Sequence, residues 1–546
     1  MQGRAFVHKG ITLLSGIDPV RRADKTADAV LIKERTLYFC PSPLYGYGLS
    51  RLLSRLETEA PDSAILCVEA DSELYQITPA KIDITPNGKL HITNMSDTCK
   101  LCSLVRETWG ERAFRRVELL RFTGGWQLYP KLYDAILTAL QNEIASNWNN
   151  AITLAKMGRL YVRNAFRNIA LSSGFPSIDT LSFGEKPVLV LGAGPSLDDF
   201  LDILRKYYNL CGREKRPFKI ICVDTCLGAL KDRNIIPDLA VILESQHWNL
   251  ADFTGCRNWE IPFALDLSAL PRSAKQLTGQ GYLFMTPWTR LRIFERLKQA
   301  GLLPAQIPPL GSVGLSAVEI ARRLTSGVII CAGLDFSFTQ DKYHARSTPG
   351  HRLKLNMYSR FHGIFNTYIY YNGITSVISK SGGQVYTNPS FRNYRALFEQ
   401  EFSNDKRLYD IIGGGLPLGI KTLTPDEAIS QLAGSNNNEA VEKNTKRENP
   451  VISAGIDTRQ IKERITYFLK SEKERLSELH DIFTGDKADT RRLITLLDEC
   501  DFLYSHFPDS RPSDEEIIGG KAASFLNRVR MEAGGMARIV ERILIS

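Results

Sequence analysis

A glycine loop at residues 192–196 is the segment of this sequence best suited to bind a phosphate. It joins an apolar run, 187–191, to a helical pattern that begins at Leu197. Glycines let the backbone approach a ligand closely, and the free N–H groups at the start of a helix favour an anion. The residues predicted to bind a nucleotide here are Gly192, Ala193, Gly194, Pro195 and Ser196. The alternative is a turn from strand to helix that holds no ligand.

The loop differs from two common nucleotide-binding fingerprints. Leu197 occupies the place of the third glycine of the dinucleotide-binding motif. The Gly-Lys-Ser/Thr sequence of a P-loop is also missing after this strand. The pattern therefore disfavours a plain Rossmann dehydrogenase and offers no support for a P-loop enzyme.

Polar side chains follow several later apolar runs. Asp224 and Thr225 follow one run, and Glu244 follows the next. Ser312 lies in a second glycine turn, and Asp335 comes after a further apolar run. Ligands in open α/β sheets bind outside the carboxyl ends of the strands. The first four residues are therefore predicted to bind the nucleotide, and Asp335 is predicted to take part in catalysis.

The order of these runs predicts how the chain is organised. Strand-like and helix-like patterns alternate from residue 187 onward, which favours a parallel sheet with helices on both faces. A shorter alternation near the N-terminus has the outline of a nucleotide-binding unit without its full glycine fingerprint, so ligand binding there stays open. The predicted segments are an α/β domain at 1–140, a helical connector at 141–186, a central Rossmann-like domain at 187–434, a linker at 435–450 and a helical domain at 451–546.

Composition narrows the classes of function. The chain has 546 residues and a formal net charge of +9, without the clustered basic residues of a nucleic-acid-binding protein. It has neither an apolar run of membrane-spanning length nor a signal-peptide pattern, so we expect a cytoplasmic protein with no membrane span. No Asp-x-Asp triplet lies beside the glycine loop, and we expect chemistry that requires no metal and no cofactor.

Several short motifs together resemble the central domain of the motility accessory factor family, the flagellin glycosyltransferases of flagellated bacteria. The motifs are Gly-Ala-Gly-Pro-Ser-Leu at 192–197, Val-Asp at 223–224, Ile-Pro-Asp at 236–238, Gly-Ser-Val at 311–313, and Gly-Leu-Asp at 333–335 followed by His344. The resemblance extends over about residues 30 to 430 and is strongest over 187–350. No single motif decides it, but their order and spacing are fairly specific.

The resemblance implies a sialyltransferase-like core and a specific reaction. A nucleotide-activated nonulosonic sugar, expected to be linked to CMP, is transferred onto Ser or Thr of flagellin. The same central domain is similar to 6-hydroxymethylpterin diphosphokinases, which move a diphosphate from ATP onto a pterin. Those enzymes are compact, and the long chain favours the glycosyltransferase. A non-catalytic accessory protein that binds a nucleotide sugar or flagellin is a third alternative.

A sialyltransferase-like reaction needs a general base for the acceptor hydroxyl. Histidine has an unperturbed pKa near ~6.5, which suits this task at neutral pH. His344 is the first candidate because it follows Asp335 in a motif-bearing loop, and His247 and His351 are the others. We accordingly predict His344 and Asp335 as the catalytic residues.

Overall fold

The structure is a computed structural model that describes residues 5–78, 88–111, 113–211, 216–361, 363, 367–434, 458–482, 489–508 and 511–545. The predicted linker at 435–450 lies outside the described residues. The chain divides into two units, one formed by Met1–Lys156 with His506–Ser510 and one formed by Met157–Ser505 with Arg511–Ser546.

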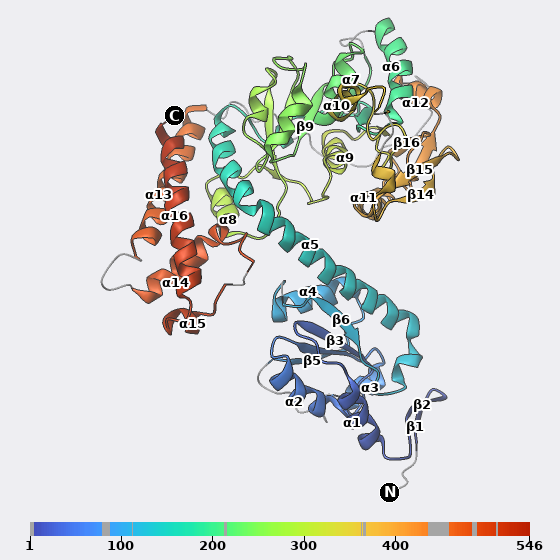
Figure 1. Ribbon diagram of the computed structural model, residues 1–546, viewed down its shortest axis with the longest axis vertical. Coiled ribbons are helices and arrows are strands. Elements are labelled where there is room, and N and C mark those ends of the chain that lie inside the picture. Colours follow the sequence, from blue (N-terminus) through green and yellow to red (C-terminus); the bar gives the residue numbers. More distant parts are fainter. Residues whose placement is uncertain are drawn as a thin grey trace. The chain divides into compact units, whose positions relative to one another are not determined.

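The first unit contains a four-stranded parallel sheet in the order β5-β4-β3-β6 (Figure 1). Alternate residues of β3 pack into two different clusters, with Phe39 in one and Tyr38 in the other. Both faces of the strand are thus buried, which explains its continuous apolar sequence. The elements of this unit are β1 (Phe6–His8), β2 (Ile11–Leu14), α1 (Pro19–Ala29), β3 (Thr36–Pro41), α2 (Leu49–Glu59), β4 (Ala64–Val68), α3 (Ser72–Ile77), β5 (Leu90–Thr93), α4 (Thr98–Trp109) and β6 (Arg116–Leu119).

Helix α5 (Pro130–Ile169) follows β6 and continues into the second unit. It therefore runs across position 140, where the sequence pattern suggested a boundary. Buried side chains such as Tyr133 and Ile136 belong to the core of the first unit, while Phe166 and Ile169 are buried in the second.

The second unit is built on a nine-stranded sheet in which every pairing is parallel. In spatial order the strands are β12 (Ala305–Gln306), β11 (Gly281–Met285), β10 (Phe263–Asp266), β9 (Leu239–Ile242), β8 (Lys219–Val223), β7 (Val188–Leu191), β13 (Ile329–Ala332), β16 (Leu408–Ile411) and β17 (Lys421–Leu423).

The strand order reverses at β7. From β7 the chain builds the sheet in one direction as far as β12 and then returns to place β13 on the other side of β7. Because crossover connections are right-handed, this reversal places α6 and α9 on opposite faces of the sheet. Ligands of open α/β sheets bind where the strand order reverses, so the loops after β7 and β13 are the expected location of a site.

The helices of this region follow the strands that they connect. They are α6 (Leu197–Cys211), α7 (Leu227–Lys231), α8 (Arg292–Gln299), α9 (Val313–Leu324), α10 (Pro349–Met357), α11 (Pro389–Phe402) and α12 (Pro425–Leu432). An antiparallel pair, β14 (Thr375–Ile378) and β15 (Gln384–Thr387), is inserted between α10 and α11.

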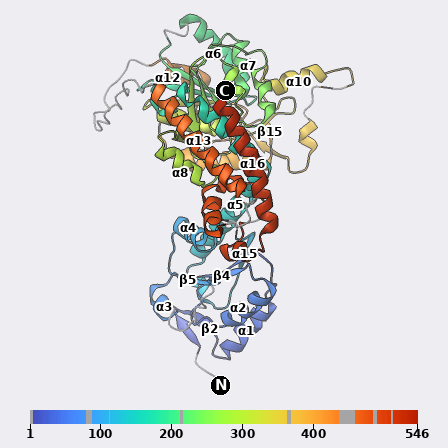
Figure 2. The ribbon, with the colours of Figure 1, turned by 90° about the vertical axis from the view of Figure 1, so that its left-hand side faces the viewer.

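Helices make up the C-terminal region, with α13 (Thr458–Asp481) and α16 (Ala523–Ile545) side by side in both views (Figures 1 and 2). The shorter helices α14 (Thr490–Glu499) and α15 (Asp514–Ile518) lie between them in sequence. Glu472 interrupts the apolar stripe of α13, and its buried carboxylate accepts two hydrogen bonds from Arg296 of α8, at 2.7 and 2.9 Å. The predicted fold class is therefore confirmed, with a large parallel α/β sheet, a smaller α/β unit before it and helices at the end.

Candidate functional site

The glycine loop after β7 packs against the loop after β13. The amide of Gly192 donates to the carbonyl of Ala332, and that of Gly194 donates to the carbonyl of Gly333, both at 2.8 Å. A Cβ on Gly192 would lie 2.4 Å from the Gly333 oxygen. This close approach of two backbones explains why residue 192 must be glycine.

Asp335 lies directly beneath the glycine loop and is 3% exposed. Its carboxylate accepts hydrogen bonds from the amide of Ser196, at 2.7 Å, and from the Ser196 hydroxyl. A Cβ on Gly194 would lie 2.5 Å from the Asp335 carboxyl carbon. The amide and hydroxyl that were predicted to bind a phosphate are thus both bonded to a carboxylate of this chain. That carboxylate supplies the anion at the start of α6.

A buried ion pair lies beside Asp335. Lys380 donates to Asp410 of β16 at 2.6 Å, and both side chains are almost fully buried. Burial raises the pKa of Asp335, and it raises the pKa of Asp410 to about 6, while the positive charge of Lys380 opposes both shifts. Sequence reasoning missed this pair, because neither residue follows a strand in a recognisable motif.

A glycine triplet after β16 completes the surroundings of Asp335. A Cβ on Gly415 would lie 2.7 Å from the Asp335 Cα, and one on Gly413 would lie 2.9 Å from the Ser196 Cβ. The amide of Leu416 donates to the Asp335 carbonyl at 2.8 Å. Three successive glycines after an apolar run are a visible signal in the sequence, and this signal was not used.

A second acidic cluster lies at the carboxyl end of β8. Asp224 is buried and accepts hydrogen bonds from the Asn249 side chain at 2.7 Å and from the Thr225 amide at 2.9 Å. Asp252 accepts from the same Asn249 amide group at 3.1 Å and from the Thr225 hydroxyl at 3.4 Å. The two carboxylates therefore share one amide donor and lie close enough to repel each other, and this repulsion favours a proton on one of them.

The environment of these two carboxyl groups shifts both pKa values upward. Burial raises the pKa of Asp224 to about 6, with a further contribution from the charge of Glu244. Burial and then the charge of Asp224 raise the pKa of Asp252 to about 7. The residue Asp252 is partly exposed, and a carboxyl group with this pKa is suited to proton transfer near neutral pH. Asn249 and Asp252 were both missed, because they lie in a short helical turn rather than directly after a strand.

The other predicted nucleotide-binding residues, Glu244 and Ser312, lie at the same edge. Glu244 is exposed just beyond β9, where it accepts from the Gln246 amide at 2.9 Å. Ser312 is partly buried at the start of α9, and its side chain makes no capping hydrogen bond there. The predicted set therefore divides into two groups. Ser312 lies near the glycine loop at the switch point, because Leu334 contacts both Gly192 and Gly314, and Glu244 lies near the Asp224 cluster.

His344 is placed beside the glycine loop, because the amide of Ala345 donates to the Ala193 carbonyl at 2.9 Å. Its ring packs edge-on against Tyr343, with ring centroids 4.9 Å apart. Burial and the positive charge of Lys354 lower the pKa of His344 to about 4. The imidazole is therefore neutral at pH 7 but a weak base. His247 is exposed, and His351 is partly buried on α10.

Replacing Gly194 is expected to destabilise the protein rather than only block a ligand. Because an added Cβ would overlap the Asp335 carboxyl group, we expect Gly194→Ala to lower the free energy of unfolding by about 1–3 kcal/mol, as overpacking does. Gly414→Ala is the matched control, since nothing lies within 4 Å of a Cβ there. Urea denaturation measures both, and equal stability of the two variants would contradict the packing described here.

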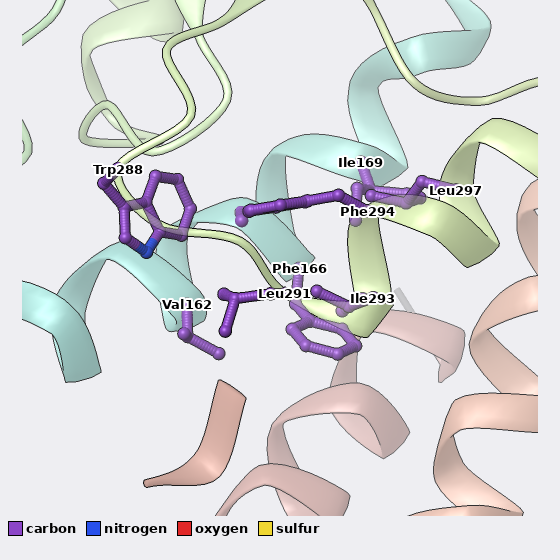
Figure 3. Close-up of a pocket in the computed structure, with 9 residues that line it drawn as sticks. Val162, Phe166, Ile169, Trp288, Leu291, Ile293, Phe294 and Leu297 are labelled. Atoms are coloured by element: carbon purple, nitrogen blue, oxygen red, sulfur yellow. The ribbon is translucent and has the colours of Figure 1, made fainter. Parts of the chain in front are cut away.

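A small apolar cavity lies between α5 and α8, beyond the carboxyl end of β11. Figure 3 shows side chains of α5, including Phe166, and of α8, including Phe294, converging on it together with Trp288. Its volume of about 10 Å³ leaves room for no more than a single water molecule. It cannot hold a nucleotide, so it is not a candidate active site.

Among the described residues, none of the helices has both the length and the apolar character required to cross a membrane.

Comparisons with a family model, with curated proteins and with solved structures each give a match. Residues 161–341 match the model of the family described as 6-hydroxymethylpterin diphosphokinase MptE-like. An uncharacterized protein of Treponema pallidum (strain Nichols) is 29% identical over 547 residues, covering 95% of this chain and 90% of that relative. The solved structure of the MAf glycosyltransferase from Magnetospirillum magneticum AMB-1 matches with a TM-score of 0.55 and 14% identity, over 100% of this chain and 92% of that one.

These matches confirm the resemblance that the sequence motifs indicated, as a domain of the MptE-like family and as a shared fold. The matched segment contains the glycine loop, the Asp224 cluster and Asp335. It ends before His344, and before Lys380 and Asp410.

Proposed function

Because this chain contains an MptE-like domain within the fold of a MAf glycosyltransferase, we propose that it is a glycosyltransferase. It moves a nucleotide-activated nonulosonic sugar, carried on CMP, onto Ser or Thr of flagellin. The observation that carries this proposal is the extent of the shared fold, which includes the first α/β unit and the C-terminal helices as well as the central sheet. A diphosphokinase domain alone would account for only part of that architecture.

The donor binds at the carboxyl edge of the nine-stranded sheet, between the glycine loop and the Asp224 cluster. The acceptor hydroxyl attacks the anomeric carbon, the new C–O bond forms, and the bond from that carbon to the phosphate oxygen of CMP breaks. The hydroxyl proton passes to a base on the enzyme. Asp252 is suited to this role, because its partly exposed carboxyl group has a pKa of about 7 and is oriented by Asn249 and Thr225. The proposal requires no metal and no cofactor.

A cytidine nucleotide is expected to stabilise the protein more than ATP does. A ligand that binds only the folded state adds about 2.7 kcal/mol to the free energy of unfolding at a hundred times its Kd. Thermal denaturation with CMP, CDP, UDP, ATP and a pterin ranks the candidates in one experiment. The transferase proposal fails if none of the cytidine nucleotides shifts the melting temperature.

The match of residues 161–341 favours one alternative, a 6-hydroxymethylpterin diphosphokinase-like enzyme. A diphosphokinase-like enzyme would be strongly stabilised by ATP and magnesium together. It would also form AMP from ATP when a 6-hydroxymethylpterin is added. Nucleotide binding without either transfer would instead identify a non-catalytic accessory protein.

A further inference from the structure

Helix α10 and the loop before it cover part of the carboxyl edge of the nine-stranded sheet. The loop is tied to the edge by the Ala345–Ala193 hydrogen bond described above. Arg352 of α10 donates to Asp232, next to α7, at 2.9 Å. The helix is therefore held over the ends of β7 and β8, with one of its faces turned toward them.

Two polar groups on α10 are buried without a partner. His351 and Lys354 are three residues apart and so lie on the same side of the helix. The Nδ1 atom of His351 and the Nζ atom of Lys354 are both inaccessible to water, and neither has a hydrogen-bond partner among the residues that the structure describes. A buried ammonium group without a partner is strongly unfavourable, and a retained one calls for an explanation such as a bound ion.

The surroundings of these groups carry more positive than negative charge. Lys342 and Arg346 lie close enough to His351 for their charges, with that of Lys354, to lower its pKa. Two carboxylates oppose these charges: Asp198, which is 3.0 Å from the Lys342 ammonium, and Asp341, whose negative charge acts on Lys354. The Asp198 carboxylate also accepts from the Arg346 amide at 2.9 Å. Asp198 is thus already shared. Asp341 accepts from the Thr339 hydroxyl at 2.6 Å, and among the described residues neither carboxylate forms an ion pair with Lys354.

We infer that the inner side of α10 is a binding site for an oxyanion, a phosphate or a carboxylate, held by Lys354 and His351. An oxyanion supplies an acceptor for the ammonium group and neutralises the excess positive charge. The site follows from the buried groups themselves. Its assignment to the sugar-nucleotide donor, whose phosphate and sugar carboxylate both have this chemistry, rests on the proposed function.

Three probes separate the possible sources of the anion. Inorganic phosphate, CMP and N-acetylneuraminic acid are titrated into the full-length protein by calorimetry. CMP offers a phosphate without a carboxylate, and N-acetylneuraminic acid offers the reverse. Binding of CMP that depends on Lys354 assigns the site to the donor phosphate. Lys354-dependent binding of the sugar acid assigns it to the donor carboxylate.

The variant Lys354→Met is expected to weaken ligand binding without lowering the stability of the ligand-free protein. We expect it to raise the Kd of the bound probe at least tenfold. We also expect the ligand-free variant to melt at the same or a higher temperature than the wild type, because an unsatisfied buried charge has been removed. Lys354→Arg keeps the charge and is expected to retain binding. Lys421→Met, at an exposed lysine of β17, is the control that should change neither quantity.

Two outcomes would overturn the inference. A lower melting temperature of ligand-free Lys354→Met, with unchanged binding, would show that the lysine has a structural partner. Lack of binding of every probe to the wild type would show that there is no oxyanion site. If cytidine nucleotides fail but inorganic phosphate binds through Lys354, the site stands and only the proposed function falls.

Discussion

Lys380→Met is expected to lower the free energy of unfolding by about 3–5 kcal/mol at neutral pH, the cost of breaking a buried ion pair from one side. Lys380 and Asp410 are 4% and 1% exposed, and their charged atoms lie 2.6 Å apart. Methionine fills a similar volume but leaves the Asp410 carboxylate buried and uncompensated. The nearby carboxyl group of Asp335 also loses the positive charge that opposes its raised pKa.

The loss should depend on pH in a defined direction. Asp410 has a pKa of about 6 in the folded protein, above the ~3.9 of an unfolded chain. A raised carboxyl pKa favours folding at low pH, and this contribution is lost as the pH rises through the folded pKa. Without Lys380 that pKa rises further. The variant should therefore be most destabilised at pH 7 to 8 and recover toward pH 5.

Urea denaturation across this pH range measures the effect, with Lys406→Met, at an exposed lysine before β16, as the control. A double variant with Asp410→Leu should regain stability, since replacing both partners by apolar groups is often neutral. A variant as stable as the wild type at pH 8 would show that the pair does not support the loops at the switch point.

The inner strands of the central sheet could be predicted because they are buried on both faces. Apolar runs such as 219–223 and 239–243 end at polar residues and coincide with β8 and β9 almost residue for residue. In a parallel sheet covered by helices, this continuous pattern is what burial requires. The start of α6 at Leu197 also agrees, because the glycine loop marks the turn.

The sequence could not reveal which group packs against Gly194. Gly194 shows that something approaches the backbone closely, and both a phosphate and a side chain satisfy that condition. The structure places Asp335 there, and its carboxylate accepts from the amide of Ser196, which lies 139 residues earlier in the chain. Lys380 and Asp410 come close to Asp335 only because the chain returns to the far side of β7 and adds β13 and β16 there. Local sequence patterns carry no information about such contacts.

The prediction of His344 as the catalytic base also rested on local sequence patterns alone. His344 lies in the predicted loop, and its position beside Ala193 agrees with a site there. Its proton affinity depends on burial and on Lys354, neither of which is visible in sequence. The sequence indicated Asp224 but not its partner Asp252. Asp252 lies in an irregular segment, and only the fold brings that segment to the end of β8.

Asp252→Asn is expected to lower the rate of sugar transfer by ~10²–10⁴-fold while leaving donor affinity nearly unchanged, as loss of a general base does. The substitution keeps the shape of the side chain and removes its ability to accept a proton. In the wild type, the rate should rise with pH through about 7, because the base must be deprotonated to act. Asp199→Asn, at an exposed position of α6, is the control.

His344→Ala tests the assignment that the sequence suggested. A base with a pKa of about 4 is already deprotonated at pH 5.5, so its contribution would give a flat rate profile from pH 5.5 to 8.5. Transfer to flagellin, followed by mass spectrometry beside a donor titration, distinguishes the two residues. A flat profile, with full activity in Asp252→Asn and loss in His344→Ala, would return the role of base to His344. A rise near pH 7 that disappears in Asp252→Asn would assign it to the Asp224–Asp252 pair, because protonation of one carboxyl group there is governed by the charge of the other.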